Sequence, residues 1–201
     1  MKTKKPILAE NGDRAALIYQ KAAQLIHEKG YDATSMNDIA RAVELTKAGL
    51  YYYIRGKQEL LYEIMNYGMD RLEKEVIEPA RAAADSEERL RTVIARHVRL
   101  LAGGIGAVSI LMDEDAGLST KQRRQIRARK RAYFEFVRDI LLGLKEEGKL
   151  RNIDVTAATL SLFGMILWLP RWYDPAGKLS ASALVEEMTK IALGGLLGSK
   201  G

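Results

Sequence analysis

The chain has 201 residues, of which 47% are hydrophobic and 29% charged, and its formal net charge at pH 7 is +6. It contains no cysteine, which excludes disulfide bonds and thiolate metal sites, and no segment approaches the roughly 20 apolar residues of a membrane span. Abundant Ala, Leu, Arg, Lys and Glu, with no sustained alternation of apolar and polar residues, predict an all-α protein. The positive charge suits a polyanionic partner but does not establish one.

The N-terminal residues 1–12 are basic but hold no long apolar run. We therefore expect neither a signal peptide nor a membrane anchor, and we expect a cytoplasmic protein. A first helix is predicted over residues 13–29, because apolar residues such as Ala22 and Ile26 recur at helical spacing. Gly30 follows as a stop signal.

Residues 33–61 contain two short helical patterns separated by a tight turn, which is typical of a helix-turn-helix unit. Ser35 is expected to cap the first helix, with Asp38 completing a capping box. The apolar pattern breaks at Glu44, and Thr46 offers a cap for a second helix that runs to about residue 52. The inward-facing residues of the two helices are predicted to be Ile39, Ala40, Val43, Leu50 and Ile54.

The second helix leaves several side chains pointing outward, as a helix that enters a DNA groove requires. Lys47 lies at its N-terminus, where a positive charge and free N–H groups favour phosphates or guanine edges. Alternatively, the three consecutive tyrosines pack a small core, but successive helical residues point about 100° apart, so one core cannot receive all three. The candidate DNA-binding residues are Lys47, Ala48, Gly49, Tyr51, Tyr52, Tyr53 and Lys57.

This stretch resembles the DNA-binding domain of TetR-family transcriptional regulators, on the residues Ser35, Ile39, Ala40, Leu50, Tyr51, Tyr52, Tyr53 and Lys57. The resemblance implies that the DNA contacts are Ser35, Lys47, Tyr51, Tyr53 and Lys57. Three positions depart from the family pattern. Glu44 stands where the family usually has a glycine in the turn, so we expect a slightly different turn, since a left-handed residue other than glycine costs about 1 kcal/mol. Gly49 and Ile54 also differ, which affects the expected base preference rather than the fold.

We predict a DNA-binding domain over residues 1–56 and a ligand-binding and dimerisation domain over residues 57–201. A long helix from Lys57 should end at Pro79 and link the two mechanically. Three further helices should begin at the caps Ser86, Thr120 and Asp154. A last helix should span about residues 180–197. The buried stripe of the longest helix is predicted as Ile126, Tyr133, Val137, Ile140 and Leu144.

The penultimate helix, from Asp154, is apolar on nearly every side and must be covered on each of them. It is followed by an amphipathic last helix, and the pair suggests burial against a second copy in a symmetric homodimer. The family resemblance also implies a dimer, in which the last two major helices of each copy form a four-helix bundle. Such a dimer implies a pseudo-palindromic, double-stranded DNA operator. The alternative is a monomer in which these helices close an ordinary core.

The second domain should also hold a small-molecule effector, because flexible and aromatic residues of the kind that line apolar pockets gather there. Residues 167–180 resemble a segment of TetR-family branches that respond to acyl-coenzyme A thioesters, including FadR-like regulators. The alternative is a structural corner between the last two helices. The basic run at 121–131 either binds the phosphates of coenzyme A or forms a solvated face. The candidate ligand-binding residues are Met112, Arg127, Phe134, Phe163, Trp168 and Arg171.

An enzyme is not expected, because His27 and His97 lie in separate helical segments and no nucleophile elbow, metal motif or phosphate loop is present. Both histidines are interpreted as structural, and no cofactor is expected. The sequence therefore predicts a ligand-controlled DNA-binding repressor that senses an acyl-CoA or another lipid-like effector. The alternatives are a drug-sensing efflux regulator and a helical ligand-binding protein without specific DNA binding.

Overall fold

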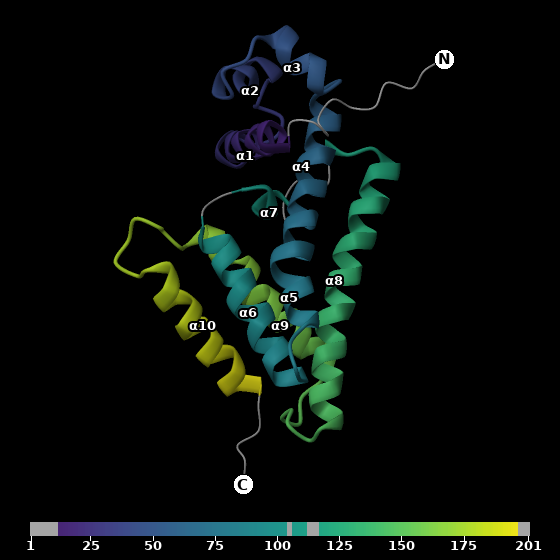
Figure 1. Cartoon of the computed structure of the whole chain (residues 1–201), viewed down its shortest axis with the longest axis vertical. Coiled ribbons are helices and arrows are strands. Elements are labelled where there is room, and N and C mark those ends of the chain that lie inside the picture. Colours follow the sequence, from purple (N-terminus) through teal and green to yellow (C-terminus); the bar gives the residue numbers. More distant parts are fainter. Residues whose placement is uncertain (1–11, 104–105, 112–116, 197–201) are drawn as a thin grey trace. The chain divides into compact units, whose positions relative to one another are not determined.

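The structure is a computed structural model, which describes residues 12–103, 106–111 and 117–196. It is built from helices, coloured in Figure 1 from purple α1 to yellow α10, which confirms the all-α prediction. The chain divides into two compact units, the first formed by residues 1–69 and 105–126, the second by residues 70–104 and 127–201. The predicted domain boundary after residue 56 lies at the start of α4, whereas the compact units divide within α4 and α8.

The first unit contains α1 (Gly12–Lys29), α2 (Met36–Ala42), α3 (Lys47–Tyr53), most of α4 (Lys57–Leu72) and α7 (Ala107–Ile110). α1 packs against α2 and α7, and α2 packs against α3. Gly68 of α4 permits a close approach, because a Cβ atom there would lie 2.7 Å from the carbonyl oxygen of Ala107. The buried side chains of this unit include Ile18, Ala22, Ile26, Leu60, Leu61, Ile64 and Met65.

The second unit contains η2 (Glu73–Ile77), α5 (Glu78–Arg81), α6 (Ser86–Ala102), most of α8 (Thr120–Glu146), α9 (Val155–Leu167), η4 (Leu169–Arg171) and α10 (Ala181–Leu196). α6 is its central element and packs against η2, α5, α9, η4 and α10. All five residues predicted as the stripe of α8 are buried, at exposures of 5% or less. α8 is followed by Gly148, which lies in the left-handed region at φ 68°.

The helix-turn-helix was predicted closely. The capping box of Ser35 and Asp38 is present, Thr46 caps α3, and the predicted inward residues of both helices are buried. Two other caps were assigned one residue too late. Asp85, not Ser86, accepts the N–H of Glu88 at the start of α6. Ser119, not Thr120, accepts the N–H of Gln122 at the start of α8.

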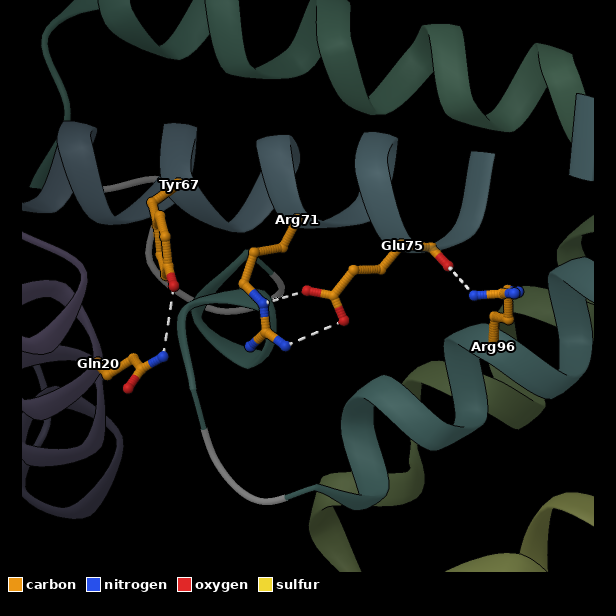
Figure 2. Close-up of polar contacts among 5 residues, drawn as sticks. All are labelled: Gln20, Tyr67, Arg71, Glu75 and Arg96. Carbon is orange, nitrogen blue, oxygen red and sulfur yellow. Dashed lines mark hydrogen bonds and ion pairs between the residues drawn. The ribbon is translucent and has the colours of Figure 1, made fainter. Parts of the chain in front are cut away.

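The prediction that Pro79 ends the long helix is wrong, because helical structure continues through it to Arg81. Residues 73–77 form a π-helical turn, in which the N–H of Glu78 reaches the carbonyl of Glu73, five residues back. A proline offers no N–H to the carbonyl four residues before it, here that of Glu75. Arg96 of α6 donates to that carbonyl instead, with Nη1 3.4 Å from the oxygen (Figure 2).

Helix α9 is buried on one side by its own chain, and the prediction assigned part of its coverage to a second copy. Val155, Leu162 and Ile166 are buried, but Leu160 is 58% exposed. On α10, Ile191 is 65% exposed, although it follows the buried Met188 by less than a turn. A shallow apolar groove of about 360 Å³ runs between these two helices. Among the described residues, these two helices therefore keep an exposed apolar face.

Candidate DNA-reading and effector sites

Helix α3, the candidate recognition helix, is anchored by two fully buried side chains, Leu50 at 0% and Ile54 at 1% exposure. The opposite face carries Lys47 and Ala48, both exposed, together with Tyr51 and Tyr52 at 42% and 61% exposure. Large aromatic side chains that stay this exposed are suited to a partner surface. The inward and outward assignment of these residues follows the sequence prediction, and one buried core does not receive the tyrosines.

Tyr53 and Gly49 lie at the edge of this surface. Tyr53 is half-buried, and its ring meets that of Tyr52 edge to face with centroids 5.4 Å apart. The N–H of Gly49 donates to the Oγ1 atom of Thr46, the cap of the helix. Tyr53 thus supports the outward ring of Tyr52, while a Cβ atom at Gly49 would lie 3.2 Å from the Oγ1 atom of Thr46.

The turn between α2 and α3 keeps a left-handed residue although no glycine is present. Glu44 has φ 56°, and the N–H of Leu45 after it donates to the carbonyl of Ala40 at 2.8 Å. The expectation of a different turn is therefore wrong. The neighbouring helices are anchored by their buried residues and caps, so the chain accepts the strain at Glu44.

Ser35 and Lys57 are both engaged inside the first unit. The hydroxyl of Ser35 caps α2, and its hydrogen bonds to Asp38, from side chain and backbone, hold the pKa of that carboxyl below its usual value. Lys57 donates to the carbonyl oxygen of Asp32 at 3.2 Å, and its ammonium lies 4.2 Å from the ring centroid of Tyr31. Lys57 thereby ties the start of α4 to the loop before α2.

A cluster of aromatic rings occupies the interior of the second unit and contains two of the candidate effector residues. Phe163 of α9 stacks on Phe134 of α8 at 6.0 Å and meets Tyr133 edge to face at 5.2 Å. His97 of α6 lies 5.6 Å from the Tyr133 ring and 6.4 Å from that of Phe163. Phe134 and Phe163 are half-buried, whereas His97 and Tyr133 are buried.

His97 and Tyr133 were not identified as site residues from the sequence. The Nδ1 atom of His97 lies 3.1 Å from the Tyr133 hydroxyl, while Nε2 has no hydrogen-bond partner among the described residues. Burial lowers the pKa of His97 from 6.5 to about 4 and raises that of Tyr133. The available signal was a polar aromatic residue at a core position in each of two amphipathic helices.

The remaining candidate ligand-binding residues lie elsewhere in the second unit or outside the described residues. Trp168 is 59% exposed at the end of α9, and the guanidinium of Arg171 lies 5.5 Å from its ring centroid. Arg127 is exposed on α8. Met112 lies outside the described residues. The structure thus pairs Phe134 with Phe163 in the interior, and Trp168 with Arg171 near the surface.

The basic run on α8 makes contacts within the protein that favour a solvated face. Arg129 pairs with Asp70 at 2.6 Å, and Arg131 lies 3.6 Å from Glu135. Arg123 donates to the carbonyl of Leu118 at 3.1 Å. Within the described ranges, no group of His, Asp or Glu side chains could hold a metal ion, and no helix is long and apolar enough to cross a membrane.

Two family models match the chain. One, described as "Bacterial regulatory proteins, tetR family", covers residues 18–64, which include α2 and α3. The other, described as "Tetracyclin repressor-like, C-terminal domain", covers residues 83–196 and therefore more than half of the chain. The first match covers N-terminal helices and the second covers C-terminal helices, in the order that the sequence predicts.

Individual proteins give the same result. The crystal structure of AibR in complex with isovaleryl coenzyme A and operator DNA is 37% identical, with a TM-score of 0.81 over 89% of this chain and 97% of that one. The transcriptional repressor KstR2 of Rhodococcus jostii is 27% identical over 93% of this chain and 92% of its own length. A fatty acid metabolism regulator protein of Bacillus subtilis is 25% identical over 74% of this chain and 77% of its own. The chain therefore belongs to the TetR family, and it is a DNA-binding transcriptional repressor of that type rather than an enzyme.

Proposed function

We propose that this repressor senses an acyl-coenzyme A thioester, and that binding of the thioester weakens its hold on the operator. The observation that carries the proposal is the similarity to AibR, which was solved with isovaleryl coenzyme A and operator DNA and matches along nearly the whole chain. The aromatic cluster of Phe134 and Phe163 supplies the apolar surroundings that an acyl group needs. No structural observation favours a cationic drug as the effector.

The DNA is bound by the outward face of α3, with Lys47, Tyr51 and Tyr52 as the side chains best placed to reach it. Ala48 and Gly49 allow close approach of the helix, Tyr53 supports the neighbouring ring, and Ser35 and Lys57 hold the unit in shape while adding contacts to phosphates. Residues 1–56 form the DNA-binding part under this proposal, and residues 57–201 the effector and dimerisation part.

The exposed apolar face of α9 and α10 is covered by the same face of a second copy. Leu160 and Ile191 are large hydrophobic side chains that are exposed on these helices, and the groove between the helices is lined by apolar residues such as Met165. A two-fold dimer places two reading helices about 34–36 Å apart, one turn of DNA. Its operator is accordingly pseudo-palindromic.

The energetics set a requirement on the effector. Shifting the protein from almost entirely DNA-competent to almost entirely incompetent takes about 5.5 kcal/mol of differential affinity. Each buried carbon of an acyl chain contributes about 0.8 kcal/mol, so a branched five-carbon acyl group supplies about 3 kcal/mol. Polar contacts to the thioester or to coenzyme A must therefore contribute the remainder when the acyl group is short.

The proposal is tested by fluorescence anisotropy with labelled DNA from upstream of the protein's own gene. The protein is titrated with isovaleryl-CoA, a long-chain acyl-CoA, free coenzyme A and a cationic dye. Release by a thioester but not by free coenzyme A supports the proposal. Release by the dye alone makes the protein a drug sensor, and tight, sequence-specific binding that ignores every compound removes the acyl-CoA assignment.

Dimerisation is tested separately by native mass spectrometry. Ile191→Glu should convert the dimer to a monomer, because it places a charge in the centre of the apolar face. Leu17→Glu is the matched control, since Leu17 is 38% exposed on α1 and lies in the other unit. A dimer that survives Ile191→Glu would place the interface elsewhere.

A further inference from the structure

The buried stripe of α6 contains a polar side chain that the described residues leave incompletely paired. His97 is 1% exposed, and its neighbours along this face, Ile94 and Leu101, are aliphatic and buried. Its Nε2 atom has no hydrogen-bond partner among the described residues. Buried polar atoms in native proteins are nearly always paired, so a ring nitrogen without a partner among the described residues is a position at which a bound group can form a hydrogen bond.

The hydrogen bond to Tyr133 decides which nitrogen of His97 carries the proton. If the Tyr133 hydroxyl donates to Nδ1, the proton lies on Nε2, and one group remains unpaired. If Nδ1–H donates instead, both the hydroxyl proton and Nε2 lack a partner within the described part of the chain. The first arrangement leaves fewer buried groups unsatisfied and is therefore favoured. His97 then presents a neutral N–H donor.

The surroundings of this donor define the chemistry of its partner. Burial keeps the imidazole uncharged, with a pKa of about 4, and the rings around it are those of Tyr133 and Phe163. A neutral donor among aromatic rings cannot compensate the lost hydration of a carboxylate or phosphate. An uncharged acceptor such as a carbonyl oxygen fits it.

The aromatic side chains also connect this donor with the less buried part of the unit. Phe163 contacts both buried rings and stacks on Phe134, and these two phenylalanines are half-buried. An apolar group that displaces or lies against them extends toward His97. The acyl end of a thioester has an apolar chain on one side of a single carbonyl. Its apolar chain suits the two phenylalanines, and its carbonyl suits the donor of His97.

We propose that the Nε2–H group of His97 donates a hydrogen bond to the thioester carbonyl oxygen of the bound effector, and that Tyr133 is a positioning residue that fixes the donating tautomer. This assignment rests on the proposed acyl-CoA function and names the group that recognises the thioester carbonyl. It also identifies a source of the polar contribution that a short acyl chain requires. A thioether analogue with the same carbon skeleton but no carbonyl should lose this contact.

The test measures, by isothermal titration calorimetry on the full-length dimer, the affinity for isovaleryl-CoA and for its thioether analogue, S-(3-methylbutyl)-CoA. The unaltered protein should bind the thioester about tenfold more tightly than the thioether, as one hydrogen bond warrants. His97→Leu and His97→Asn should abolish that preference, because neither places a donor at the Nε2 position. His97→Gln, whose amide reaches that position, should restore part of it, and Tyr133→Phe should reduce it.

Operator affinity without effector should stay unchanged in each variant, and thermal unfolding reports whether it folds. If His97→Leu fails to fold, His97→Asn and Tyr133→Phe carry the comparison. A merely structural His97 would alter the melting temperature and leave the thioester preference intact, which would overturn the assignment. Failure of the unaltered protein to bind any acyl-CoA would instead overturn the proposed function, and this assignment with it.

Discussion

The guanidinium of Arg96 donates to the backbone carbonyl of Glu75, which is the acceptor that Pro79 leaves without its helical donor. The carboxylate of Glu75 is held at the same time by Arg71, with Nε–Oε1 and Nη2–Oε2 distances of 2.7 and 3.2 Å (Figure 2). The π-helical turn that precedes the proline is thus supported from two sides. Helix α6, which also carries His97, is bonded in this way to the end of the long helical segment.

We expect Arg96→Met to destabilise the protein by about 0.5–1 kcal/mol, the usual net contribution of one hydrogen bond. In a Pro79→Ala background the same substitution should cost less, because the alanine that replaces the proline can supply an N–H to the Glu75 carbonyl. The double-mutant cycle is measured by urea denaturation. Arg99→Met, at an exposed position on the same helix, is the control. Equal costs of Arg96→Met in both backgrounds would show that the two residues do not share this carbonyl.

The strain at Glu44 gives a second prediction. Its left-handed conformation costs about 1–2 kcal/mol for a residue with a Cβ atom, and glycine removes that cost while adding about 0.5–1 kcal/mol of chain entropy. Glu44→Gly should therefore stabilise the protein by up to about 1 kcal/mol, whereas Glu44→Val should destabilise it. Thermal unfolding measures both. Arg41→Gly, at an exposed helical position of α2, should be destabilising, and a similar loss from Glu44→Gly would contradict the strain.

The local features that could be predicted from the sequence are those set by neighbouring residues. The capping box of Ser35 and the buried pair Leu50 and Ile54 depend on spacings of three and four within a few turns, so periodicity was sufficient. The passage of the helix through Pro79 could not be predicted in this way. The carbonyl that the proline leaves without a donor is bonded by Arg96, which lies 17 positions away in another helix, whereas local propensity alone favours termination.

The site shows the same division. The outward face of α3 follows from helical geometry, and Tyr51 and Tyr52 are exposed as predicted. The role of Lys57 within the fold was missed, because its partners Tyr31 and Asp32 are brought near it only by the turn of the chain. The unpaired nitrogen of His97 was also missed, since the sequence shows that a histidine lies in a core stripe but not which of its atoms lack partners.

Lys47 and Lys57 should respond differently to removal of their charge. Lys47 is exposed, so Lys47→Ala should weaken operator binding and reduce the slope of log affinity against log salt by about one, with little change in stability. Lys57→Ala should in addition lower the free energy of unfolding, by about 0.5–1.5 kcal/mol, because it loses the contacts to Tyr31 and Asp32. Anisotropy titrations at several salt concentrations and urea denaturation separate the two effects.

Lys178→Ala, at an exposed loop position of the second unit, is the control for both lysines. It removes the same charge from the protein as a whole and should change neither the salt slope nor the stability. An unchanged salt slope in Lys47→Ala would exclude a phosphate contact by this residue. A fully stable Lys57→Ala variant would mean that its internal contacts contribute nothing.

His97 should make the stability of the protein depend on pH between about 4 and 6.5. Its pKa is about 4 in the folded chain and 6.5 when exposed, so the unfolded state binds more protons within this window. The stabilisation is fully present above pH 6.5 and is lost as the pH falls toward 4, by an amount on the order of 3 kcal/mol. The carboxyl of Asp38, whose pKa is lowered from 3.8, acts in the same direction only at lower pH, which keeps the two contributions apart. Urea denaturation at half-unit pH steps measures the free energy of unfolding. Between pH 4 and 6.5 this free energy should change less with pH for His97→Leu than for the unaltered protein. Parallel profiles would mean that water reaches the imidazole and keeps it protonated in the folded state.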